Sequence, residues 1–342
     1  MRKYHFAGSR VIKTAVAILL TAFICEQLNW SPVFAVITAI VTVEPTVSES
    51  IKKGIIRFPA SAIGSGYAVL FILLFGSSPL TYTLAGTLTI ITCSKLRLHA
   101  GLLVATITSV AMVDVVHDNY FLNFFIRLAT TSIGLFVSTV VNMFMLPPNY
   151  TKDIELGIMK IRRKVGVSIT AVFTEILQNE EMKLVRSADL ISDLDKSLQK
   201  AETLVRFQTD ESKYHPLVGL KKQTFLAAQN QLHTLRLIHY HLENLLDTPL
   251  HTISWTSEEK NHLLESIYLL NNCLNQEDNF DEEQHENQMN KLAEIFWEDN
   301  EQITKNNHVH PTNFPPELII MYELLSIYSL IKRFYLKEDH AV

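Results

Sequence analysis

The first 146 residues of the chain are a succession of apolar runs joined by short polar connections. The stretch from Trp30 to Gly66 shows the pattern most clearly, because two apolar runs flank a segment that carries Lys52, Lys53 and Arg57. Each run is about as long as the hydrocarbon core of a bilayer is thick. The pattern therefore predicts helices that cross a membrane.

The same reading extends to six spans, which we expect at about residues 11–28, 32–43, 55–75, 80–94, 100–116 and 121–146. The connections alternate in charge. Basic residues occur before the first span, near Lys52, near Lys95 and after Pro148, whereas the other three turns lack Lys and Arg. Because basic loops remain in the cytoplasm, this alternation predicts that both termini and the whole second half lie there.

Beyond Asn149 the chain becomes strongly charged, and its apolar residues recur at intervals of three and four. The first such stripe comprises Ile158, Ile161, Val165, Ile169, Val172 and Ile176, and the last comprises Leu318, Tyr322, Leu325, Tyr328, Ile331 and Tyr335. This spacing is typical of amphipathic helices that bury one face. We therefore predict an all-α protein with a six-helix transmembrane domain (1–148) followed by a cytoplasmic α-helical bundle of five or six helices (149–342).

Three cations, Lys13, Arg57 and Arg127, lie in or beside the predicted spans. A desolvated cation is energetically expensive, and one that faces a cavity can bind an anion. These residues are our candidates for binding a substrate that carries a carboxylate. The alternative is that their side chains reach the membrane surface and only set the topology.

The sequence Glu44-Pro45-Thr46 closes the second predicted span. Pro45 can interrupt the helix, and Glu44 can pair with Lys53 or Arg57 and hold a gate closed. The alternative is a capped helix end with no gating role. In the next span Gly64 and Gly66 are candidates for close helix packing, because small residues let helix backbones approach each other in lipid.

Other kinds of chemistry find little support in the sequence. Cys25, Cys93 and Cys273 are widely separated, which favours reduced thiols over a disulfide framework or a metal site. No Gly-rich phosphate loop followed by Lys and Ser or Thr occurs, and no nucleophile–base arrangement or long basic patch stands out. We therefore expect no cofactor, no metal, no nucleic-acid partner and no enzymatic activity.

The central stretch resembles a known family. The resemblance rests on the run from Pro32 to Val43, on Glu44-Pro45-Thr46, Ser50, Lys53-Gly54 and Arg57, and on the following helix with Gly64 and Gly66. These features are similar to the fusaric acid resistance-like superfamily and, within it, to the bacterial aromatic acid exporter family, whose order of domains matches essentially the whole chain. One departure is Pro59-Ala60-Ser61, where many members have a glycine soon after the counterpart of Arg57.

The resemblance implies an exporter of small organic anions, above all aromatic carboxylic acids, in the bacterial inner membrane. Six short spans enclose little interior, so we expect a homodimer or higher homo-oligomer, surrounded by membrane lipid, with the transport path near the subunit interface. Two alternatives remain open at this stage. One is a passive organic-anion channel, and the other is a membrane scaffold whose helical domain binds a cytoplasmic partner.

Overall fold

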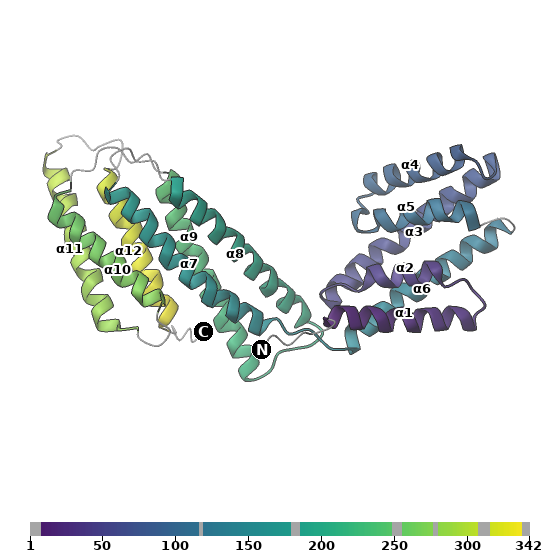
Figure 1. Cartoon of the computed structure of the whole chain (residues 1–342), viewed down its shortest axis with the longest axis horizontal. Coiled ribbons are helices and arrows are strands. Elements are labelled where there is room, and N and C mark those ends of the chain that lie inside the picture. The colour runs from purple at the N-terminus through teal and green to yellow at the C-terminus, as the bar shows by residue number, and fades with distance from the viewer. Residues whose placement is uncertain are drawn as a thin grey trace. The chain divides into compact units, whose positions relative to one another are not determined.

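The computed structural model describes residues 8–115, 119–178, 185–247, 255–275, 280–306 and 315–336. Over these residues it contains twelve α-helices and no strand (Figure 1). The all-α fold predicted from the sequence is therefore confirmed. The chain divides into two compact units, of which the first comprises Met1–Asn149 with Phe207–Pro216 and the second comprises Tyr150–Arg206 with Leu217–Val342.

The first unit contains the apolar helices. They are α1 (Ser9–Gln27), α2 (Val33–Thr42), α3 (Val47–Phe75), α4 (Pro79–Lys95), α5 (His99–Val115) and α6 (Tyr120–Phe144). Helix α3 is central, since it packs against α4, α5 and α6, while α1 packs against α2 and α6. Within the described ranges, α3 and α6 are long and apolar enough to cross a membrane, and α2 and α5 are shorter apolar helices. Six spans and the orientation of the termini thus remain predictions.

Helix α3 begins well before the predicted span at residue 55. The Thr46 side chain accepts a hydrogen bond of 3.2 Å from the backbone N–H of Glu49 and caps the helix at its N-terminus. Thr followed three residues later by Glu is a helix-start signature. The sequence analysis placed Lys52 and Lys53 in a loop, but they lie in the first turns of α3. Pro59, which falls within the third predicted span, lies inside the helix.

Two glycines of the first unit lie directly against a backbone carbonyl group of a neighbouring helix. A Cβ atom at Gly64 of α3 would collide with the carbonyl group of Ala105 on α5, and one at Gly134 of α6 would collide with the carbonyl group of Ala35 on α2. At Gly66 no heavy atom lies within 4 Å of the position that a Cβ would occupy. Close packing is therefore found at Gly64 and at Gly134, which the sequence analysis did not single out, and not at Gly66.

The second unit is built from longer, amphipathic helices. They are α7 (Thr151–Gln178), α8 (Val185–Glu211), α9 (Leu220–Asp247), α10 (Ser257–Asn275), α11 (Glu282–Asn306) and α12 (Pro316–Tyr335). Only the part of α8 that ends at Arg206 belongs to this unit. All six residues of the stripe predicted for α7 are buried in one core shared by these helices. On α12 the prediction was partly wrong, because Tyr322 is exposed. It lies two residues, about 200°, around the helix from the buried Leu324.

Candidate functional site

Two rows of polar side chains run through the first unit. On α3 the row consists of Lys53, Arg57, Ser61 and Ser65, and on α6 it includes Arg127, Thr131, Ser138 and Asn142. Residues three, four or seven apart share one face of a helix, so each row lies along one face. The hydroxyl oxygens of Ser61 and Thr131 lie 3.3 Å apart and join the two rows. Apart from Lys53, every one of these side chains is buried.

Glu44, in the connection between α2 and α3, lies between two cations. Its carboxylate accepts a hydrogen bond of 2.7 Å from Nη2 of Arg57 and one of 2.9 Å from Nζ of Lys53. Arg57 also donates from Nε to the carbonyl oxygen of Ala100 at 3.2 Å. The structure therefore places Glu44 beside both partners that we considered. The formal charge of Arg57 is balanced in this arrangement, and a gating role for Glu44, Pro45 and Lys53 remains a prediction.

Asn142 of α6 also binds the connection between α2 and α3. Its side-chain amide donates to the hydroxyl of Ser50 at 2.8 Å, to the carbonyl oxygen of Glu44 at 3.1 Å and to that of Thr46 at 3.3 Å. Nζ of Lys13 in turn donates to Oδ1 of Asn142 at 2.8 Å. Lys13 is thus a buried cation held by neutral oxygen atoms. It helps to fix the connection and does not extend to the surface.

The carboxylate of Glu211, which lies far along the chain, binds the start of α3. Oε2 of Glu211 accepts a hydrogen bond of 3.1 Å from the backbone N–H of Val47, the first residue of α3. His215 contacts the other carboxylate oxygen at 2.7 Å, and Glu211 is fully buried. A negative charge is favourable at a helix N-terminus, where backbone N–H groups lack partners within the helix. The segment Phe207–Pro216 accordingly belongs to the first unit.

Arg127 has a different environment from Arg57. Its guanidinium donates to the hydroxyls of Thr131 at 2.7 Å and Thr108 at 2.5 Å, and its Cζ lies 4.4 Å from the centre of the Phe34 ring. Its side chain is only 3% exposed. Among the described residues no carboxylate pairs with it, and its Nε has no hydrogen-bond partner. A buried cation without a counter-ion is energetically costly, so this position favours the binding of an anion.

The sequence analysis identified the cations of this site and Glu44 but missed the neutral members and Glu211. Asn142 and Thr108 bind cations, Ser50 accepts a hydrogen bond from Asn142, and Glu211 caps α3. The spacing of Arg127, Thr131, Ser138 and Asn142 along one predicted span was a readable signal for a polar helix face. No local signal points to Glu211, which lies 164 residues after its partner Val47.

Comparison with known proteins shows similarity along both units. Residues 5–145 match the family model described as aromatic acid exporter family member 1. The chain is 48% identical over 336 residues to a UPF0421 protein of Oceanobacillus iheyensis, with 98% of this chain and 97% of the relative covered. A UPF0421 protein of Bacillus cereus is 42% identical over 334 residues, covering 97% of this chain and 94% of the relative. A UPF0421 protein of Staphylococcus haemolyticus is 36% identical over 330 residues, covering 96% of each chain.

Proposed function

This chain belongs to the aromatic acid exporter family, and we propose that it exports small organic anions, aromatic carboxylic acids in particular, across the bacterial inner membrane. The family resemblance predicted from the sequence is thereby confirmed. Membership of an exporter family supports a location in the membrane and a role in transport. The names of the relatives specify no substrate, so the class of anion is part of the proposal.

The observation that carries the proposal is the environment of Arg127. A permanently charged guanidinium is buried among apolar helices, two of its N–H groups are oriented by threonine hydroxyls, and its Nε lacks a partner among the described residues. A carboxylate can accept hydrogen bonds from such a group with good geometry. An aromatic ring attached to that carboxylate would enter an apolar environment that includes Phe34.

Arg57 and Lys13 have other roles in this proposal. Arg57 is paired with Glu44. Lys13 donates hydrogen bonds to Asn142 and interacts electrostatically with the buried carboxylate of Glu211, so both cations have a negative charge nearby in the conformation observed. We assign Glu44, Lys53 and Arg57 to a gate between α2 and α3. Separation of the Glu44–Arg57 pair would open this gate and expose a second cation to the anion. Pro45 permits the change because it cannot continue a helical hydrogen-bond pattern.

The proposed arrangement in the membrane follows from the alternation of basic loops. Helices α1 to α6 would span the membrane, with both chain ends in the cytoplasm, although Met1 and Val342 themselves lie outside the described residues. Many large apolar side chains of these helices are exposed, among them Leu73, Phe125 and Phe136. Lipid would cover part of this surface, and a second copy of the chain in a homodimer would cover another part.

Export by Arg127 variants tests the proposal. The protein is reconstituted into liposomes, and efflux of radiolabelled 4-hydroxybenzoate is measured for the native chain and for Arg127→Met. Arg97→Met is the matched control, because Arg97 is an exposed arginine in the turn that follows α4. We expect Arg127→Met to lose most of its flux while it remains folded, and Arg97→Met to keep it. Native flux in Arg127→Met would contradict the proposal, and flux that follows voltage alone, without dependence on a pH gradient, would favour a passive channel.

A further inference from the structure

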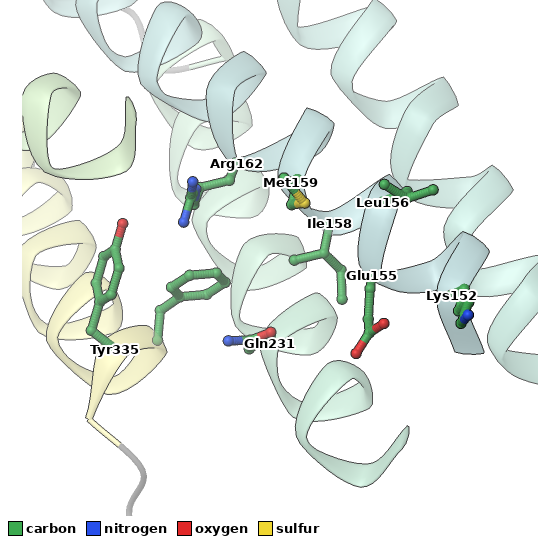
Figure 2. Close-up of a pocket in the computed structure, with 9 residues that line it drawn as sticks. Lys152, Glu155, Leu156, Ile158, Met159, Arg162, Gln231 and Tyr335 are labelled. Atoms are coloured by element: carbon green, nitrogen blue, oxygen red, sulfur yellow. The ribbon is translucent and has the colours of Figure 1, made fainter. Parts of the chain in front are cut away.

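The second unit contains a pocket that the proposed transport path does not use. It has a volume of about 640 Å³, within the range of small-molecule sites, and is bordered by α7, α9 and α12 (Figure 2). Its lining combines charged, polar and apolar groups: Lys152, Glu155, Leu156, Ile158, Met159, Arg162, Gln231, Phe334 and Tyr335. The members from α7 recur at intervals of three and four and therefore share one face of that helix.

Arg162 is the only charged side chain in this lining that is buried, with 7% of its surface exposed. Figure 2 shows this side chain extending from α7 on the side of the pocket where Tyr335 of α12 lies. Lys152 and Glu155 are exposed, so they contribute charge at the open side and are well solvated. The lining as a whole carries two formal positive charges and one negative charge.

The aromatic side chains of α12 are held rigidly next to this charge. The Tyr335 hydroxyl donates a hydrogen bond of 2.7 Å to the carbonyl oxygen of Cys273, and its ring stacks on Phe280 with the ring centres 4.7 Å apart. Burial raises the pKa of Tyr335 to about 12, so the side chain stays a neutral phenol. Phe334 packs edge-on against Tyr335. With Ile158 and Met159, these rings form an apolar wall that does not repel an anion.

We propose that this pocket binds a small aromatic carboxylate. The carboxylate would pair with the buried guanidinium of Arg162, and the ring would lie against Phe334 and Met159. A single buried cation beside an apolar wall suits one carboxylate on one ring, whereas a phosphate would call for more buried donors. Binding is inferred from the pocket alone. That the ligand belongs to the same class as the exported anion rests on the proposed function.

Equilibrium binding to the purified full-length protein in detergent tests this inference, with 4-hydroxybenzoate as the probe and calorimetry as the readout. Benzamide serves as an uncharged control ligand, and cyclohexanecarboxylate as one without an aromatic ring. Two variants alter the pocket. Arg162→Gln removes the cation, and Met159→Trp fills the space from a position that is 36% exposed, where a larger side chain leaves the core intact. Lys160→Gln is the matched control, since Lys160 is exposed on α7 and does not line the pocket.

We expect Arg162→Gln to weaken binding of 4-hydroxybenzoate about tenfold or more, the usual effect of losing a charged hydrogen bond. Met159→Trp should also weaken binding, because the larger side chain occupies the space of the ligand ring. Lys160→Gln should bind as the native chain does, and benzamide should bind weakly. Arg127→Met should still bind 4-hydroxybenzoate in this pocket. A loss of export and a loss of binding to the pocket are therefore measured separately. Native affinity in folded Arg162→Gln and Met159→Trp, or equal affinity for benzamide and 4-hydroxybenzoate, would overturn the inference.

Discussion

The ion pair between Glu44 and Arg57 allows a quantitative prediction. Arg57 is 5% exposed and Glu44 is 9% exposed, and their atoms are 2.7 Å apart. The substitution Glu44→Gln keeps the shape of the side chain but leaves the guanidinium without a negative partner. Removal of one member of a buried pair destabilises a protein by about 3–5 kcal/mol. Because an amide oxygen can still accept a hydrogen bond and Ala100 still binds Nε, we expect the lower end, about 3 kcal/mol.

The matched control is Glu49→Gln. Among the described residues Glu49 forms an ion pair only with Lys53, at 3.4 Å, and both side chains are partly exposed, so we expect a loss of less than about 1 kcal/mol. The melting temperatures of the purified Glu44→Gln and Glu49→Gln proteins are compared by thermal unfolding in the same detergent. The double variant Glu44→Gln/Arg57→Met should recover part of the lost stability, since it removes the uncompensated charge. Equal melting temperatures for Glu44→Gln and Glu49→Gln would refute the reasoning.

Three further predictions concern other parts of the chain. Gly134→Val should destabilise the first unit by about 1–3 kcal/mol, because its side chain would meet the carbonyl of Ala35, whereas Gly66→Ala should be neutral within about 0.5 kcal/mol in the same thermal assay. Burial lowers the pKa of His285 from 6.5, so the unfolded chain binds more protons in acid. Stability should therefore fall as pH decreases from about 7 through 6.5 and below, and His285→Gln should flatten this dependence in unfolding followed by circular dichroism. If the stability of His285→Gln depended on pH as steeply as that of the native chain, the attribution of this dependence to His285 would be wrong. Burial raises the pKa of Cys273 to about 11, so at pH 8 iodoacetamide should label it on the order of two hundredfold more slowly than an ordinary thiol. Mass spectrometry measures this rate, and labelling as fast as in the denatured chain would show the prediction to be wrong.

Hydrophobic periodicity predicted the helices well and their ends less well. The stripe from Ile158 to Ile176 identified the buried face of α7, because a helix that packs on a core must repeat its apolar residues every three or four positions. The start of α3 was misplaced because Lys52 and Lys53 suggested a loop. The cap formed by Thr46 and Glu49 decides the boundary, and both residue types were visible in the sequence.

Of the candidate site, only the cations and Glu44 were predictable from the sequence. Rules for buried cations drew attention to Lys13, Arg57 and Arg127, and all three are buried. The difference between them depends on partners in three dimensions. Arg57 has a carboxylate, Lys13 has Asn142, and among the described residues Arg127 has only hydroxyls and the Phe34 ring. The contact between Lys13 and Asn142 spans 129 positions of the chain, and a contact over that separation leaves no local pattern in the sequence.

The Glu211 carboxylate at the start of α3 affects when this helix can be capped during synthesis. Ribosomes make Val47 long before Glu211, so α3 emerges with its first N–H unprotected and gains its anionic cap only after another 164 residues have been synthesised. A fragment that stops at Asn149 would contain all six apolar helices and still lack this cap. Biochemists who wish to isolate the apolar half should therefore supply residues 207–216 as a separate peptide or fuse them to the shortened chain.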